Sequence, residues 1–328
     1  MTREEALRRI ERAADEKLMK LDLSGLQLEE LPPEIAKCTQ LETLLLGNLF
    51  DKKRAWSRKT NKLTEFPDAV LGLTNLKILD LCFNQITSIP EAIGQMSNLT
   101  KLLLSVNQIT FIPEALGQLS NLKKLDLCFN QITSIPGAIG QLSNLRALFL
   151  SNNQITEIPK GVEQLSNLKY LNLRENQITK VPEDIGNLSN LTCLCLSKNQ
   201  ITKVSQAIGK MSNLKCLDLD NNQITFIPEA IGQLSNLRLL GLNNNQITFI
   251  PEAIGQLWKL IVLGLTYNHI TSIPEAIGQL SNLRWLFLGE NQITHLPEAI
   301  GQLPKLIQCE PFFDRREPES FRGPCPSF

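Results

Sequence analysis

Three cysteines have a spacing that could bring thiols together. Cys193 and Cys195 are two residues apart, and Cys216 follows Cys193 after an interval of 23 residues. Thiolates bind zinc, but structural zinc sites take four ligands, and catalytic sites add histidine or a carboxylate. No fourth ligand is evident in the sequence. We therefore expect no metal site, and interpret the three residues as small surface thiols.

The two histidines, His269 and His295, are the candidates for acid–base chemistry. A serine–histidine–aspartate site needs all three side chains within hydrogen-bond reach, and neither histidine is followed by an evident nucleophile or orienting acid. The chain also lacks the GxxxxGK[ST] loop that binds nucleotide phosphates. We therefore predict no catalytic residue and no cofactor, and expect that the protein is not an enzyme.

The elements that must position these side chains are set by an internal repeat. The decapeptide LCFNQITSIP occurs at residues 81–90 and again at residues 127–136, and this interval of 46 is two periods of 23. Twelve units follow the pattern LxxLxLxxNxIxxIPxxIGxLxx, and positions are counted from its first leucine. The units begin at Leu18, Leu41, Leu76, Leu99, Leu122, Leu145, Leu168, Leu191, Leu214, Leu237, Leu260 and Leu283.

Each unit predicts a strand and a turn. The alternation in LxxLxL is typical of a short strand with one buried face. Proline in IPxxIGxL suits a tight turn or the first residue of a short helix. One unit cannot enclose its seven apolar positions, so the units must stack. We predict an α/β fold, a solenoid shaped as a curved horseshoe, with a parallel β-sheet on its concave face and turns and short helices on its convex face.

An asparagine recurs at the ninth position. A buried amide both donates and accepts hydrogen bonds, and a buried backbone group without a partner costs about 1–3 kcal/mol. We therefore predict a structural ladder that joins adjacent turns. Its members are Asn84, Asn107, Asn130, Asn153, Asn176, Asn199, Asn222, Asn245, Asn268 and Asn291.

The period divides the chain into three parts. Residues 1–17 are expected to form a capping helix, because Thr2 and Glu5 fit a capping box and Leu7, Ile10 and Ala14 share one helical face. Residues 18–305 hold the twelve repeats, with an insertion at about 49–60 in the second. Residues 306–328 abandon the period and are expected to form an irregular tail or cap.

These motifs resemble those of leucine-rich repeat proteins over residues 18–305. The 23-residue IPxxIGxL variety, with LDLSGLQLEELPPEI at residues 21–35, is similar to the repeat arrays of bacterial Roco proteins and of Ras-associated leucine-rich repeat scaffolds. The resemblance implies a bacterial signalling scaffold that binds proteins. Its finer implication is the regulatory repeat array of a Roco-type GTPase system.

Composition narrows the classes of partner. Thirty-three basic and thirty-three acidic residues give no net field to attract nucleic acid or an anionic membrane. The charged N-terminus is unlike a signal peptide, and no apolar run is long enough to span a bilayer. Eight cysteines without a CxxC pair suit free thiols in a reducing compartment. We expect a cytoplasmic protein with a protein partner, no nucleic acid and no membrane insertion.

Charged residues recur on the strands. Asp22, Asp80, Asp126 and Asp218 hold the fifth position and are expected to face solvent, while lysine or arginine is frequent at the second position. Exposed pairs of opposite charge contribute about 0–1 kcal/mol. We interpret this pattern first as a device for solubility and second as one for recognition.

The variable strand positions are the part of each unit free to differ, so we expect partner binding on the concave face. Exposed aromatic residues on a rigid sheet are typical interface anchors. One predicted patch is Phe83, Leu103, Val106, Phe129, Phe149 and Tyr170; a second is Val262, Tyr267, Trp285 and Phe287. In the insertion, Arg54, Trp56 and Arg58 could contact an acidic partner.

Two other functions remain open. The near-identical NQIT and PEAIGQL segments would also suit a consensus-like structural array without a dedicated partner. A bacterial effector enzyme would use the repeats for substrate recognition and Cys309 or Cys325 as the nucleophile, but only about twenty residues follow the array. A homodimer is a further possibility, and the sequence does not identify the partner.

Overall fold

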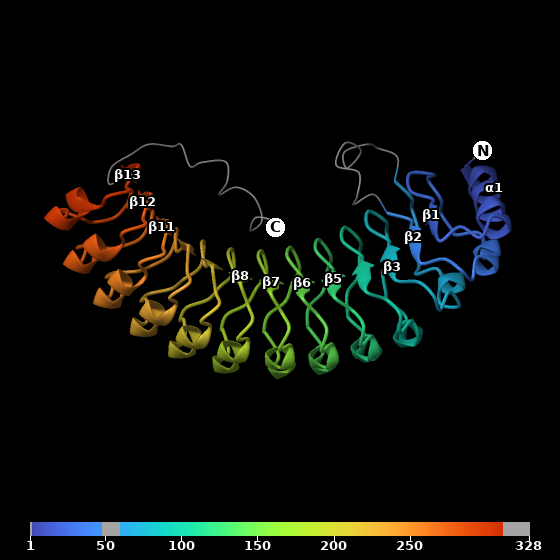
Figure 1. Cartoon of the computed structure of the whole chain (residues 1–328), viewed down its shortest axis with the longest axis horizontal. Coiled ribbons are helices and arrows are strands. Elements are labelled where there is room, and N and C mark those ends of the chain that lie inside the picture. The colour runs from blue at the N-terminus through green and yellow to red at the C-terminus, as the bar shows by residue number, and fades with distance from the viewer. Residues whose placement is uncertain (1, 48–59, 311–328) are drawn as a thin grey trace. The chain divides into compact units, whose positions relative to one another are not determined.

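The computed structural model describes residues 2–47 and 60–310, within two compact units, Met1–Ile155 and Thr156–Phe328. Arg54, Trp56 and Arg58 of the insertion, and Cys325, lie outside the described residues. In both units, the strands labelled in Figure 1 follow one side and the coiled turns follow the other.

The first unit starts with a helix and continues with strands and 3₁₀-helices in alternation. Its strands are parallel and pair in chain order, from β1 to β6. The elements are α1 (Thr2–Asp15), β1 (Lys20–Asp22), η1 (Pro33–Lys37), β2 (Thr43–Leu45), η2 (Asp68–Val70), β3 (Ile78–Asp80), η3 (Glu91–Gln95), β4 (Lys101–Leu103), η4 (Glu114–Gln118), β5 (Lys124–Asp126), η5 (Gly137–Gln141) and β6 (Ala147–Phe149).

The second unit repeats the same alternation, and its strands are paired in parallel in chain order from β7 to β13. The last strand lies beyond residue 305, where the repeats were expected to end. The elements are η6 (Lys160–Gln164), β7 (Tyr170–Asn172), η7 (Glu183–Asn187), β8 (Cys193–Cys195), η8 (Gln206–Lys210), β9 (Cys216–Asp218), η9 (Glu229–Gln233), β10 (Leu239–Gly241), η10 (Glu252–Gln256), β11 (Val262–Gly264), η11 (Glu275–Gln279), β12 (Trp285–Phe287), η12 (Glu298–Gln302) and β13 (Gln308–Glu310).

The seven apolar positions of the repeats form the core of each unit between strands and 3₁₀-helices, although Leu296 in the twelfth repeat is 38% exposed. In the third repeat, for example, all seven are at most 1% exposed; they are Leu76, Leu79, Leu81, Ile86, Ile89, Ile93 and Met96. Each repeat covers the leucines of its neighbour, as stacking requires. The predicted fold class, a solenoid with a parallel sheet on one side and short helices on the other, is confirmed.

The helices of the turn side are single 3₁₀ turns. In η3 the amide of Ile93 donates to Pro90 and the amide of Met96 donates to Ile93, so proline opens the turn and one further bond closes it. Glycine at position nineteen permits close stacking. A Cβ on Gly117 would lie 2.4 Å from the carbonyl oxygen of Ala138 in the next turn, so a larger residue would push the turns apart.

Each ninth-position asparagine joins two adjacent repeats through its buried amide. The Oδ1 atom of Asn130 accepts a hydrogen bond from the Ile109 amide at 3.0 Å, and its Nδ2 atom donates to the Leu104 and Leu127 carbonyls at 3.1 and 3.0 Å. Asn107 and Asn153 make the same contacts one repeat earlier and one later. The amide thus satisfies backbone groups that the sheet leaves without partners.

Two further sets of amides were missed by the sequence analysis. Asn61, which is 2% exposed, makes the ladder contacts in the second repeat, and removal of the twelve inserted residues would have placed it at position nine. Exposed asparagines at position twenty-three form a second series: the Nδ2 atom of Asn98 donates to the Thr74 carbonyl at 2.9 Å, and Asn121 does the same to Ser97 at 3.0 Å.

Helix α1 packs against the first repeat. Its buried residues are Ala6, Ile10 and Ala13, a face shifted by about one residue from the expected one, and Leu7 is partly exposed. The side chain of Gln40 donates to the carbonyls of Ala13 and Leu18, which fixes the end of the helix. Glu5 contacts Arg8 and Arg9, and these guanidinium groups lower the pKa of its carboxyl, Arg9 contributing most.

We predict that Asn130→Ala lowers the free energy of unfolding by about 3 kcal/mol, because it strips partners from several buried backbone groups. The matched control is Asn121→Ala, which removes one exposed hydrogen bond and is expected to cost less than about 1 kcal/mol. Urea unfolding followed by circular dichroism measures both. Equal losses in the two variants would contradict the role of the buried ladder.

Candidate interaction surface

On the strand face, which is the strand side of each unit, side chains at position five accept hydrogen bonds from the backbone amide at position seven. Oδ1 of Asp80 accepts a hydrogen bond from the Cys82 amide at 2.9 Å, and Asn172 does the same for Arg174 at 3.0 Å. Asp80 is 1% exposed and Asp126 is 7% exposed. The expectation that these aspartates face solvent is therefore wrong for both, because their carboxylates serve a local backbone turn.

Burial of these carboxylates has an electrostatic cost. Removal from water raises the pKa of Asp126 and of Asp218, although Lys124 opposes the shift in the first and the Ser197 hydrogen bond opposes it in the second. The Lys124 Nζ atom is 3.9 Å from Asp126 Oδ2. The hydrogen bond to the backbone therefore forms despite the free-energy cost of removing a charged carboxylate from water.

The eighth position is left-handed in every repeat from the third to the twelfth. The φ angles lie between 52° and 58°, at Phe83, Val106, Phe129, Asn152, Glu175, Lys198, Asn221, Asn244, Tyr267 and Glu290. The amide of this residue still donates to the seventh residue of the next repeat, as Phe129 does to Ser151 at 2.8 Å. The chain reverses here so that the ladder asparagine enters the core. Left-handed backbone is costly for residues other than glycine and asparagine, above all for β-branched valine.

The predicted anchor residues differ in their exposure. Phe129 and Tyr267 are each 55% exposed, whereas Phe83, Val106, Phe149, Tyr170 and Trp285 are partly buried. Leu103, Phe287 and Val262 are buried, with exposures of 1%, 4% and 7%. The most accessible aromatic side chains are therefore at position eight. The three buried residues hold positions three and five of their strands, where the side chains of closely spaced neighbouring strands cover them.

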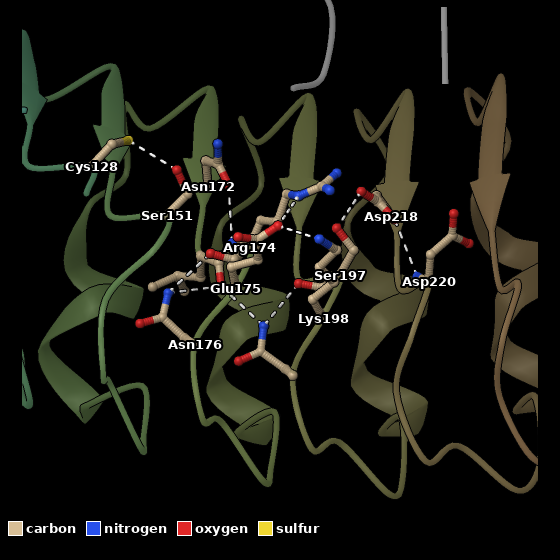
Figure 2. Close-up of polar contacts among 12 residues, drawn as sticks. Cys128, Ser151, Asn172, Arg174, Glu175, Asn176, Ser197, Lys198, Asp218 and Asp220 are labelled. Carbon is tan, nitrogen blue, oxygen red and sulfur yellow. Dashed lines mark hydrogen bonds and ion pairs between the residues drawn. The ribbon is translucent and has the colours of Figure 1, made fainter. Parts of the chain in front are cut away.

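A polar network covers the strand ends of the second unit (Figure 2). Ser197 Oγ donates to Asp218 Oδ2 at 2.7 Å, and the Asp220 amide donates to Asp218 Oδ1 at 3.2 Å. Nearby, Glu175 accepts from Lys198 at 2.5 Å and from Arg174 at 3.4 Å. Opposite charges on this surface compensate one another.

The network continues through two glycines at position five. Asp220 accepts from the Asn243 amide at 2.7 Å, and Asn243 accepts from the Thr266 amide at 2.9 Å. A Cβ on Gly241 would lie 2.8 Å from Asp220 Oδ1, and one on Gly264 would lie 2.6 Å from Asn243 Nδ2. Here the seventh-position side chain of one repeat caps the next repeat, and glycine leaves the space for it.

The cysteine cluster is buried. Cys193 and Cys195 are 7% and 2% exposed, with their Sγ atoms 3.7 Å apart. The hydrogen bond with Cys193, together with burial, raises the pKa of Cys216. Burial likewise raises the pKa of Cys128 to about 12. The interpretation of Cys193 and Cys195 as surface thiols is therefore wrong.

The expectation of reduced thiols fails at Cys195, which is disulfide-bonded. The cysteines recorded outside a disulfide among the described residues are Cys38, Cys82, Cys128, Cys193, Cys216 and Cys309.

The described residues contain no cluster of three or more histidine, cysteine or acidic side chains arranged to hold a metal ion. His269 and His295 are both exposed, and the recorded side-chain contact of His295 is with Thr294 at 3.0 Å. Within the described ranges, no helix has the length and apolar character needed to cross a bilayer.

Exposed aromatic residues also lie away from the strand face, a feature the sequence analysis missed. Phe111 and Phe249, at position thirteen, are 49% and 51% exposed, and Trp258, at position twenty-two, is 50% exposed. Phenylalanine at a position held in most other repeats by serine, glutamate, lysine or histidine was a signal in the sequence. Lys259 lies over the Trp258 ring, with Nζ 4.8 Å from its centroid.

This arrangement, parallel strands joined by buried asparagines and closed by 3₁₀ turns, defines a repeat solenoid. Models of the leucine-rich repeat match the chain: a leucine-rich repeat region at residues 131–220 and 160–241, and leucine-rich repeats at 59–109, 97–155, 248–308 and 236–257. The chain belongs to the leucine-rich repeat family. No match was found among curated proteins.

Solved structures agree with this assignment. A leucine-rich repeat protein of Leptospira interrogans is 34% identical, with a TM-score of 0.57; the match covers 90% of this chain and 91% of that one. An internalin of Listeria monocytogenes is 24% identical, with a TM-score of 0.71 and 94% of each chain covered, which shows the shared fold. A plant peptide hormone receptor is 28% identical, with a TM-score of 0.56, over 84% of this chain and 56% of that one.

We predict that Val106→Asn raises the free energy of unfolding by about 1 kcal/mol, because asparagine tolerates the left-handed backbone better than valine. The reverse change at the eighth position two repeats later, Asn152→Val, is expected to lower it by a similar amount. Thermal and urea unfolding measure both. Stabilisation by Asn152→Val would contradict the assigned backbone cost.

We predict that Asp218→Asn stabilises the fold at neutral pH. The raised pKa means that the folded state binds the carboxyl proton more tightly than the unfolded state does. The protonated Asp218 carboxyl therefore contributes stability below the unfolded pKa, and this contribution is lost as pH rises through the folded pKa. The variant's advantage should therefore be largest near pH 7 and vanish near pH 3. Asn172→Asp, at the same position of β7, should show the opposite change. A pH series of urea midpoints tests this.

Proposed function

We propose that the chain is a protein-interaction module that holds its partner on the strand face. The observation that carries this proposal is that the side chains of Phe129 and Tyr267 are each 55% exposed. The backbone that presents these side chains is fixed by contacts on both sides of the residue. The Phe129 amide donates to Ser151, and the following residue is the buried Asn130. An aromatic anchor on rigid backbone binds with little loss of conformational entropy.

The comparisons support the general class. The plant receptor structure shows a peptide hormone receptor of this fold in complex with its ligand, at 28% identity over part of that chain. Fold similarity alone does not transfer a ligand, so this chain's partner is proposed from its own surface. The buried Asp80 carboxylate on the strand face has a structural role, because it accepts a hydrogen bond from the Cys82 amide.

The finer assignments stay predictions. A role in a Roco-type GTPase system, signalling as a Ras-associated scaffold, a bacterial source and a cytoplasmic location rest on the sequence resemblance and composition. A homodimer is tested directly by light scattering, since it doubles the mass of the 328-residue chain.

We predict that photo-crosslinking residues at positions 129 and 267 each capture a partner protein from cells, because each side chain extends from the strand face of its own unit. Residues introduced at positions 111 and 249, which are equally exposed elsewhere on the repeats, are the matched controls. Mass spectrometry identifies the products. The purified partner should then bind Phe129→Glu at least tenfold more weakly than the wild-type chain, and Phe249→Glu with unchanged affinity.

Two results would contradict the proposal. Crosslinks formed from positions 111 and 249 but not from 129 and 267 would place the partner on another face. Affinity unaffected by Phe129→Glu, with a confirmed fold, would favour the structural array without a dedicated partner on this surface.

A further inference from the structure

The strand face of the first unit carries a cluster of cations that the fold does not require. Lys101, Lys123, Lys124 and Arg146 lie at the starts of the consecutive strands β4, β5 and β6, and Lys101 pairs in register with Lys124. The amide of Lys123 donates to the carbonyl of Thr100, and that of Arg146 to the carbonyl of Lys123, so these side chains are also neighbours. Neighbouring strands are about 4.8 Å apart, and like charges directly opposite one another destabilise a sheet.

Little nearby charge compensates this basic cluster. Lys123 and Arg146 are exposed, Lys101 is partly exposed, and the described residues offer none of the three an ion pair. For the fourth cation, the ion pair found among the described residues joins Lys124 Nζ to Asp126 Oδ2 at 3.9 Å, and Asp126 is 7% exposed. The basic cluster therefore presents an excess of positive charge to solvent.

The same strand positions in the second unit show that stacking does not need these lysines. Position three of β7 to β12 holds no cation; its residues are Tyr170, Cys193, Cys216, Leu239, Val262 and Trp285. Lys215 and Arg238 occupy position two on β9 and β10 without a lysine beside them at position three. The basic cluster is thus a local property of the first unit's face, placed where repeats are free to differ.

Apolar side chains border the basic cluster toward the ends of the same strands. Phe149 lies beneath Lys124, with Nζ 5.0 Å from the ring centroid, and Phe129 is 55% exposed. Five residues separate positions three and eight, a reach of at most about 17 Å at strand rise, and an α-helix with side chains is about 10–12 Å across. The distance between the cations of the basic cluster and the Phe129 ring therefore suits a single helix that contacts the cations on one side and the ring on the other.

We propose that this face binds an acidic amphipathic helix, whose carboxylates face Lys101, Lys123, Lys124 and Arg146 and whose apolar side packs on Phe129. Successive carboxylates at i and i+4 are about 5–6 Å apart, close to the strand spacing of the cations. A single-stranded nucleic acid fits less well, because base stacking needs free aromatic faces and Lys124 already covers Phe149. This inference rests on the proposed function and specifies its partner's chemistry.

The test uses the full chain and a synthetic 16-residue peptide of glutamate and leucine with helical spacing, followed by fluorescence anisotropy. We expect Lys123→Glu/Arg146→Glu to weaken binding at least tenfold. The matched control is Lys215→Glu/Arg238→Glu, which makes the same charge change at the same positions in the second unit and is expected to alter binding less than twofold. Binding should also weaken as salt rises, because exposed charges are screened.

Thermal unfolding of each variant confirms its fold, and the milder Lys123→Gln/Arg146→Gln provides a second reading if the reversal unfolds the chain. Three results overturn the proposal: equal weakening in both double variants, tighter binding of a 16-residue oligothymidylate than of the peptide, or no peptide binding at millimolar concentration. Each is distinct from failure of the proposed function, because crosslinking at positions 129 and 267 reports a partner whatever its charge.

Discussion

The buried amide of the ninth-position asparagine is the interaction on which the rest of the structure depends. It accepts from a backbone amide of the preceding repeat and donates to carbonyls of its own strand and its neighbour, as Asn107 does with Ile86, Leu104 and Leu81. Short three-residue strands leave many backbone groups unpaired where the chain turns. The amide removes that deficit and fixes the register between repeats.

This constraint also shapes the surface on which we propose that a partner binds. To place the asparagine in the core, the preceding residue takes a left-handed conformation, and its side chain stands outward beside the strand face. Asparagine meets the backbone requirement at residues 152, 221 and 244, whereas Phe129 and Tyr267 meet it at an energetic cost. The proposed binding surface rests on these aromatic residues, which hold a strained and exposed position.

The sequence was sufficient to predict the parallel sheet, the seven core positions and the position of the ladder, because all follow from a 23-residue period. It was not sufficient for contacts in which one repeat serves the next. Nothing local in Gly241 reveals that Asp220 occupies the space of its missing side chain, and Asp80 reads as a surface charge until its amide partner is seen. Leu103 and Phe287 were expected on the exposed face but are buried, since exposure at position five depends on both neighbouring strands.

Hydrogen exchange at single amides tests the central role of the ladder most directly. The Ile86, Ile109 and Ile132 amides donate only to asparagine Oδ1 atoms, at 3.0 Å each, among the hydrogen bonds described. The account predicts that they exchange as slowly as the paired strand amides of Leu81 and Leu104, through unfolding of the stack. Exchange as fast as that of solvent-exposed loop amides would show that the asparagines do not hold the repeats together.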